Sequence, residues 1–139
     1  MFPDAIRGFE SSAKSKLSII DTEDNSGGKI INVPVISIDK FCEENKIIPN
    51  LIKMDIEGAE LWALKGMQNL LKKGKTKLII EMHQFAWEEF GYSGADFIQF
   101  IASFPLYELF DGNGNKITQA TENFNDNNKL GYVALLPIK

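Results

Sequence analysis

The chain has 139 residues, enough for one domain with its own hydrophobic core, and its 44% hydrophobic and 24% charged residues are typical of a globular protein. A net charge of −4, with no basic stripe to pair with phosphates, argues against nucleic acids and anionic membranes as partners. One cysteine excludes an internal disulfide framework, and no apolar run approaches the roughly 20 residues that span a bilayer, so we expect a soluble, cytoplasmic protein.

Two short strands and a helix are predicted in the first third of the chain. Leu17–Ile20 is a strand candidate, and Ile30–Ile36 is a second β-rich run. Pro34 inside the second run predicts an edge strand or a break, because proline cannot donate to a sheet ladder. Ser37 is then well placed to cap a helix of about two turns that ends at Asn45.

The stretch from residue 51 to residue 58 is the most informative part of the sequence. Leu51–Ile56 is a nearly continuous apolar run, the pattern of a strand buried on both faces of a parallel sheet. Asp55 and Glu57 stand where this run ends, and Gly58 follows as the breaker. In an open α/β sheet, ligands bind in the crevice beyond the carboxyl ends of the strands, so acids at this position are well sited for chemistry.

A single helix is predicted between Gly58 and the stop at Gly74. Its apolar stripe consists of residues three and four apart, namely Ala63, Leu64, Met67, Leu70 and Leu71. Leu78–Met82 is a second buried strand, so residues 51–82 form one βαβ unit whose two strands are expected to be parallel.

The segment after the second strand is rich in aromatic residues. Gln84–Tyr92 is predicted to be a short helix or a loop over the candidate site. Apolar residues then repeat at helical spacing from Phe97 to Phe104, and Pro105 ends that helix.

The last part of the chain has the pattern of antiparallel strands. Leu106–Phe110 and Lys116–Thr118 flank a turn rich in glycine and asparagine, which predicts a hairpin. Thr121–Lys129 has the composition of a loop. Leu130–Ile138 is the final strand, and its length and apolar content predict a position in the interior of the sheet.

The stretch around the acids resembles a known family. Lys53–Glu60, followed by Leu64–Gly66, is similar to the K-x-D-x-E-G-x-E…L-K-G signature of FkbM-type S-adenosylmethionine-dependent methyltransferases. Three flanking segments also resemble the family: Val35–Asp39, Ile79–His83 and Gly131–Pro137. The resemblance covers roughly residues 10 to 139, and it corresponds to the second half of the family's domain.

The resemblance implies an α/β, Rossmann-like class I methyltransferase fold, of which residues 1–139 form the C-terminal half as a single partial domain. This half consists of a parallel βαβ unit plus antiparallel closing strands. The N-terminal strands and the glycine-rich turn that bind the cofactor are expected to be absent, as in a truncated product or a C-terminal fragment. Strand Leu51–Asp55 would then lack a neighbour on one side, which predicts a possible homo-oligomer through this exposed strand.

The activity that the resemblance implies is transfer of a methyl group from S-adenosylmethionine, most often to a hydroxyl of a sugar or a natural product. Asp55, Glu81 and His83 are the predicted catalytic residues. His83 is the best candidate for a general base, because the reference pKa of histidine near 6.5 suits proton removal at neutral pH. Asp55 and Glu57 are the predicted cofactor-binding residues, and the partner is a small-molecule acceptor.

Several alternatives stay open at this point. Phe85, Trp87 and Tyr92 are predicted to line an apolar acceptor pocket, and plain packing is the alternative. Glu57 and Glu60 also fit a role in complementing the helix dipole. No metal is predicted, although the carboxylates and the single imidazole could bind a divalent ion. The competing function is a non-catalytic α/β fragment that acts as an interaction or vestigial module, because the glycine-rich cofactor loop is missing.

Overall fold

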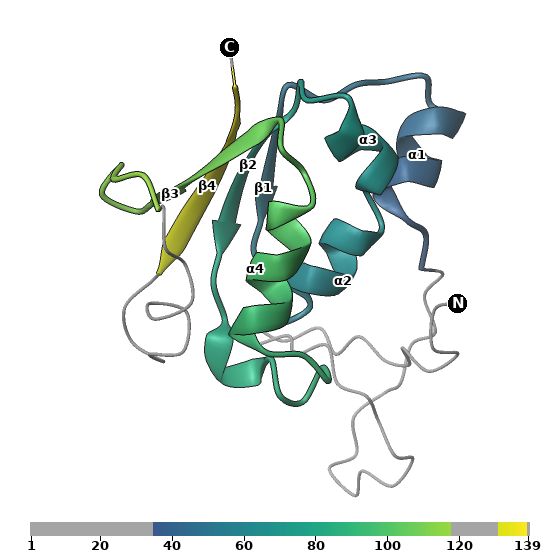
Figure 1. Ribbon diagram of the computed structural model, residues 1–139. Coiled ribbons are helices and arrows are strands. Elements are labelled where there is room, and N and C mark those ends of the chain that lie inside the picture. Colours follow the sequence, from purple (N-terminus) through teal and green to yellow (C-terminus); the bar gives the residue numbers. More distant parts are fainter. Residues whose placement is uncertain (1–34, 118–130, 139) are drawn as a thin grey trace, which may run out of the picture. The chain divides into compact units, whose positions relative to one another are not determined.

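A computed structural model describes residues 35–117 and 131–138 (Figure 1). The chain divides into two units, residues 1–35 and 36–139, and all described residues except Val35 belong to the second unit. The predicted strand Leu17–Ile20 and the predicted loop Thr121–Lys129 lie outside the described residues. Of Ile30–Ile36 only the last two residues are described, and they belong to no strand. Whether residues 1–139 form one domain stays a prediction.

The described residues contain a four-stranded mixed sheet with the order β1-β2-β4-β3. Its strands are β1 (Leu51–Met54), β2 (Lys77–Glu81), β3 (Tyr107–Asp111) and β4 (Tyr132–Pro137). β1 and β2 are parallel, and β4 is antiparallel to both of its neighbours, β2 and β3. These pairings confirm the predicted parallel βαβ unit, the antiparallel closing strands and the interior position of the final strand. Of the predicted hairpin, the described residues show a bridge between Phe110 and Lys116, and Thr118 lies outside the described residues.

The described residues contain five helical segments. α1 (Ile38–Glu44) precedes β1, and α2 (Glu60–Lys65), α3 (Gln68–Lys72), the 3₁₀ turn η1 (Gln84–Ala86) and α4 (Gly94–Ala102) lie between β1 and β3. Ser37 caps α1 by accepting a hydrogen bond from the backbone N–H of Lys40, as predicted. Ser93 and Asp96 form a capping box at the start of α4. None of the helices in the described ranges is long and apolar enough to cross a membrane, and α4, with 9 residues, is the longest of them.

The sheet is covered on one face only within the described part of the chain. α2, α3 and α4 lie together on one side of it (Figure 1). The side chains on that face are almost completely buried at Leu78, Ile80, Val133 and Leu135. On the other face of β2, Lys77 and Ile79 are exposed. The prediction that the strand from Leu51 is buried on both faces is therefore wrong, because the described helices pack against a single face and Leu51 and Lys53 are exposed.

β1 lies at an edge of the described sheet. Among the described strands it pairs only with β2, and Leu51 at its start is 54% exposed. Only Met54 of this strand is buried. An unpaired strand edge is a template for pairing with another chain. Association through β1 stays a prediction, since no second chain is present.

The single helix predicted after Gly58 is wrong, because the chain breaks it into α2 and α3. Gly66 ends α2, and Met67 leaves the helical region with φ −127°. The break is stabilised from outside by Asp39 of α1. Its backbone N–H donates to the carbonyl oxygen of Gly66, and its two carboxylate oxygens accept from the N–H groups of Asn69 and Leu70 at 2.9 Å each. Asp39 thereby caps the first turn of α3, a helix about 30 residues further along the chain.

Replacing Asp39 by alanine is expected to lower the free energy of unfolding by about 1–2 kcal/mol, because two N–H groups of α3 lose their acceptor. Asp39→Asn keeps one acceptor oxygen and should lose about half as much. Urea titration followed by circular dichroism measures the loss. Glu43→Ala on the exposed side of the same helix is the matched control and should stay within about 0.5 kcal/mol of the parent. Equal stability of Asp39→Ala and this control would contradict the capping role.

Candidate functional site

A tight turn connects β1 to α2 and places the acids of the signature. β1 ends at Met54, and Glu57 and Gly58 then adopt positive φ angles of 55° and 110°. Glycine adopts such angles at no steric cost, whereas a glutamate there carries strain of about 1 kcal/mol or more. The turn brings the side chains of Asp55 and Glu57 to the same place, next to the end of β2.

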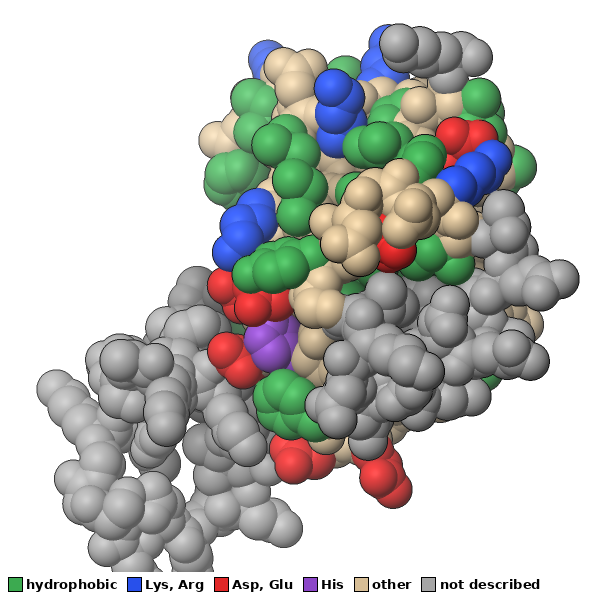
Figure 2. Space-filling view, turned by 90° about the vertical axis from the view of Figure 1, so that its left-hand side faces the viewer, with side chains coloured by type: hydrophobic (Ala, Val, Ile, Leu, Met, Phe, Trp, Pro, Cys, Tyr) green, Lys and Arg blue, Asp and Glu red, His purple; other side chains and the backbone are tan. Residues whose placement is uncertain are grey.

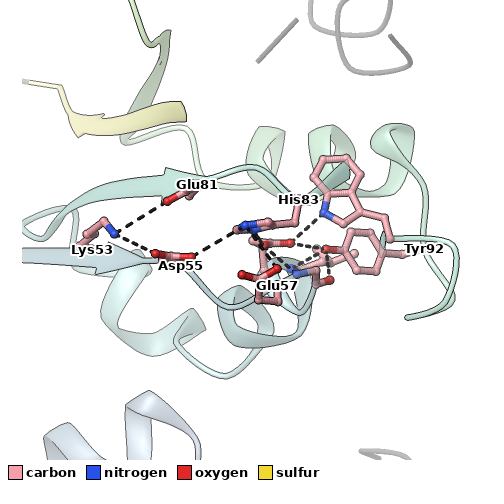
Figure 3. A network of polar contacts seen from close by, with 10 residues as sticks. Lys53, Asp55, Glu57, Glu81, His83 and Tyr92 are labelled. Atoms are coloured by element: carbon pink, nitrogen blue, oxygen red, sulfur yellow. Dashed lines mark hydrogen bonds and ion pairs between the residues drawn. The ribbon is translucent and has the colours of Figure 1, made fainter. Parts of the chain in front are cut away.

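Glu60, the first residue of α2, is completely buried, with a relative exposure of 0%. Its Oε1 lies 3.0 Å from the N–H of Gly58 and 3.0 Å from Nδ1 of His83. Its Oε2 accepts a hydrogen bond of 2.8 Å from Nε1 of Trp87 and lies 3.0 Å from the hydroxyl of Tyr92 (Figure 3). A carboxylate has about four acceptor positions, and all four are used here. The cost of burying this charge is therefore offset by a complete set of hydrogen bonds.

Tyr92 also connects the network to the turn. Its hydroxyl lies 2.7 Å from the carbonyl oxygen of Gly58, so its single proton is shared between this oxygen and Glu60. Burial, first, and then the neighbouring Glu60 charge raise the pKa of Tyr92 far above its ordinary value. The tyrosine therefore stays neutral and acts as a fixed part of the structure.

His83 follows β2 and joins the buried network to the surface. Its Nδ1 faces Glu60, while its Nε2 lies 3.8 Å from Oδ1 of Asp55 and 3.7 Å from Oε2 of Glu57. The two longer distances exceed those of direct hydrogen bonds. Figure 2 shows the imidazole at the surface between acidic side chains, with hydrophobic side chains next to them. Asp55, Glu57 and Glu81 are called the acidic rim below.

Lys53 neutralises part of the acidic rim. Its Nζ lies 3.0 Å from Oδ2 of Asp55 and 3.8 Å from Oε2 of Glu81 (Figure 3). The hydrogen bond to Lys53 is the main cause that holds the pKa of Asp55 below its usual value, and the same bond raises the pKa of Lys53. Both side chains are about half exposed, so the pair adds little stability.

Replacing Lys53 by methionine is expected to raise the pKa of Asp55 toward its ordinary value, because the hydrogen bond and the positive charge that favour the ionised form are both lost. Carbonyl-carbon NMR of the aspartate side chains, recorded as a function of pH, measures the change. Lys77→Met, at an exposed position of β2, is the control and should leave the titration unchanged. A pKa of Asp55 that does not rise in Lys53→Met would show that another group stabilises the carboxylate.

The structure brings together all four polar residues that the sequence predicts for catalysis and cofactor binding: Asp55, Glu57, Glu81 and His83. One ligand atom each from Asp55, Glu81 and His83 lie within 4.8 Å of one another, a spacing that a divalent ion could bridge. Lys53 supplies positive charge to the same two carboxylates. The absence of a metal stays a prediction. The arrangement places one ionisable imidazole nitrogen, Nε2, beside carboxylates at the carboxyl ends of two parallel strands, which suits acid–base chemistry.

The three aromatic residues that are predicted to line an acceptor pocket lie in different surroundings. Phe85 is 63% exposed and lies edge-on to the imidazole of His83, with ring centroids 5.9 Å apart. Trp87 and Tyr92 are buried at 3% and 7% exposure and point their polar atoms at Glu60. Trp87 also stacks on Phe97 at 5.3 Å. Of the three aromatic residues, only Phe85 lies open beside His83, and the pocket stays a prediction.

Comparison with known proteins gives one match. A family model described as the methyltransferase FkbM domain matches residues 1–111. The match includes the whole site from Lys53 to Tyr92, and β4 lies beyond it. Comparisons with curated proteins and with solved structures found no match.

Proposed function

Since the chain belongs to the FkbM methyltransferase domain family, we propose that it transfers a methyl group from S-adenosylmethionine to a hydroxyl oxygen of a sugar or natural-product scaffold. Methyl transfer in general, and with it dependence on S-adenosylmethionine, follows from the family. The proposal goes beyond the family in naming a hydroxyl group as the methyl acceptor. The family match does not favour the alternative of a non-catalytic interaction module.

The observation that carries the proposal is the position of His83 Nε2. This nitrogen lies on the surface side of the imidazole, 3.7 Å from Glu57 and 3.8 Å from Asp55. A hydroxyl group placed beside it can hydrogen-bond to Nε2 and to a carboxylate at the same time. Nε2 of His83 would take up the hydroxyl proton as the oxygen bonds to the methyl carbon and the bond from that carbon to the sulfonium sulfur breaks, with the neutral sulfide as the leaving group. The carboxylates of the acidic rim orient the acceptor through its neighbouring hydroxyl groups.

The residues present fit one part of the cofactor. When bound, S-adenosylmethionine supplies an electrophilic methyl group on a positively charged sulfur. Asp55 and Glu57 provide negative charge beside His83, which favours a sulfonium or an ammonium group nearby. In the described residues, no glycine-rich turn precedes a helix as it does in nucleotide-binding sites. We therefore assign Asp55 and Glu57 to the cationic part of the cofactor alone.

We also infer that the sheet is the C-terminal half of a Rossmann-like class I methyltransferase fold. The support is the order β1-β2-β4-β3, in which two parallel strands are followed by an antiparallel closing pair. The candidate site lies at the carboxyl ends of β1 and β2, the edge at which open α/β sheets bind ligands.

Calorimetric titration of the full chain with S-adenosylhomocysteine and with S-adenosylmethionine, with and without magnesium, tests the proposal. We expect both compounds to bind. The Glu57→Gln variant should weaken binding of S-adenosylmethionine, whose sulfur is positively charged, by about 1.5- to 5-fold more than binding of S-adenosylhomocysteine, whose sulfur is uncharged. Glu89→Gln, at an exposed position, is the control. A folded sample that binds neither compound would contradict the assignment of cofactor binding to this chain.

A further inference from the structure

We propose that Glu60 is a positioning residue for His83. It holds a proton on Nδ1 of the imidazole, so that the histidine exchanges protons only through Nε2, at the acidic rim. Glu60 touches no rim side chain in the described contacts, and its role is exerted through the imidazole. The protonation pattern follows from the hydrogen bonds of this structure, whereas its value for catalysis rests on the proposed function.

The first step of the argument is the set of donors around Glu60. The N–H groups of Gly58 and of the Trp87 indole can only donate, and each faces a different carboxylate oxygen. Oε1 therefore already accepts from Gly58 when it meets Nδ1 of His83 at 3.0 Å. A carboxylate oxygen cannot donate, so a hydrogen bond across this distance requires the proton to be on Nδ1.

The second step is the fixed orientation of the ring. His83 is 9% exposed, and the edge-on ring of Phe85 packs beside it. Rotating the imidazole by half a turn would place a carbon atom against Oε1, which would lose one of its two hydrogen bonds in a buried site and keep only that from Gly58. Nδ1 thus stays at the buried end and Nε2 at the rim end.

The third step is the surroundings of Nε2. The charged groups that face it are Asp55 and Glu57, at 3.8 and 3.7 Å, and both carboxylates are partly exposed. Lys53 lies one contact further away, on Asp55 and Glu81. Among the described residues, Nε2 has no hydrogen-bond partner within 3.5 Å, so this nitrogen is the end of the ring that is open to a proton donor or acceptor from solution.

The test is nitrogen-15 NMR of the imidazole in the full chain. His83 is the only histidine, so its two ring nitrogens give the only histidine side-chain signals. We expect a protonated Nδ1 at every pH at which the chain is folded, and a change of protonation on Nε2 alone. A neutral form with the proton mainly on Nε2, or an even mixture of the two forms, would overturn the proposal without any reference to activity.

Glu60→Gln is the informative variant. Its amide presents one acceptor and one donor, whereas the N–H groups of Gly58 and Trp87 both need an acceptor. We expect the amide oxygen to face Trp87, which makes the shorter hydrogen bond (2.8 Å against 3.0 Å), and the N–H of Gly58 then loses its acceptor. The amide N–H₂ group then faces Nδ1, so the proton should move to Nε2 and the neutral form should invert. Tyr92→Phe is the matched control, because it removes a hydroxyl from Oε2 and leaves the contact between Oε1 and Nδ1 intact. If Glu60→Gln does not fold, the parent chain and Tyr92→Phe still decide the question.

Kinetic measurements distinguish a role of Glu60 in positioning His83 from a general role in the structure. With the proton on Nε2, the methyl-transfer rate of Glu60→Gln should fall about 10²-fold or more and lose the dependence on pH that the imidazole confers, while affinity for S-adenosylhomocysteine stays within about twofold. Weakened cofactor binding together with an unchanged pH profile would show a structural role only. Failure of the parent chain to bind the cofactor refutes the proposed function, and an Nε2-protonated imidazole in the parent chain refutes the role of Glu60.

Discussion

Alanine in place of Gly58 is expected to destabilise the chain by about 2–5 kcal/mol, a large share of the 5–15 kcal/mol that holds a typical domain folded. Two costs add. An L-residue at φ 110° is strained, at about 1–2 kcal/mol. A Cβ at this position would also lie 2.6 Å from Cβ of Ala86 and 2.9 Å from the ring of Phe90, and such overpacking costs about 1–3 kcal/mol. Urea titration of the parent chain and the variant measures the difference.

Gly91 provides the matched control for the backbone strain. It also has a positive φ, 73°, but a Cβ there would meet no atom within 4 Å. Gly91→Ala should therefore cost only about 1–2 kcal/mol. In the double variant Gly58→Ala/Ala86→Gly the closest contact disappears, so part of the loss should be recovered beyond what the two single changes predict. Equal losses for Gly58→Ala and Gly91→Ala would show that the close packing against η1 does not contribute to the free energy of unfolding.

The requirement for glycine at position 58 links the fold to the site. The N–H of Gly58 donates to Glu60, and its carbonyl oxygen accepts from Tyr92. Both the N–H and the carbonyl oxygen of Gly58 thus connect the turn between β1 and α2, through hydrogen bonds, to the network that holds His83. A shift of this turn by a few tenths of an ångström would lengthen several of these hydrogen bonds together.

The sequence predicted the parts of the fold that depend on local signals. The apolar runs of β1 and β2, separated by a helical pattern of suitable length, were enough for a parallel βαβ unit, and this pairing is confirmed. The break between α2 and α3 was not predictable in this way, because its main support is Asp39, 30 residues upstream of the amides that it caps. The covered and open faces of the sheet also depend on which elements pack on it, which periodicity alone does not determine.

The candidate site also has a part that was predictable from the sequence and a part that was not. The convergence of Asp55, Glu57, Glu81 and His83 was predictable, because the carboxyl ends of neighbouring parallel strands lie at one edge of a sheet. The central position of Glu60 was missed, since a glutamate in the first turn of a helix already has a local explanation in the helix dipole. One signal could have revealed it. Glu60 stands four residues before Leu64 on the same face of the helical pattern, and this spacing predicts that its carboxylate points into the core.

Replacing Glu60 by alanine is expected to be the most damaging substitution of a charged residue in the described part of the chain, with a loss of about 3–5 kcal/mol. The change leaves the N–H groups of Gly58 and Trp87 and Nδ1 of His83 without an acceptor in a buried space, and each unsatisfied group costs about 1–3 kcal/mol. Tyr92 keeps the carbonyl oxygen of Gly58 as its partner, and water that enters the vacated volume satisfies part of the rest. Glu89→Ala, an exposed glutamate, should stay within about 0.5 kcal/mol of the parent.

A double-mutant cycle with Trp87→Phe identifies the origin of this loss. In the parent chain Trp87→Phe takes one donor from a buried carboxylate and should cost about 1–3 kcal/mol. In the Glu60→Ala background the indole N–H has already lost its acceptor, so the same replacement should cost only the packing that is lost with the smaller ring. The expected coupling is therefore about 1–3 kcal/mol. If the two changes were additive instead, the loss at Glu60 would come from the cavity alone. The buried network would then fix the imidazole of His83 without contributing to the stability of the fold.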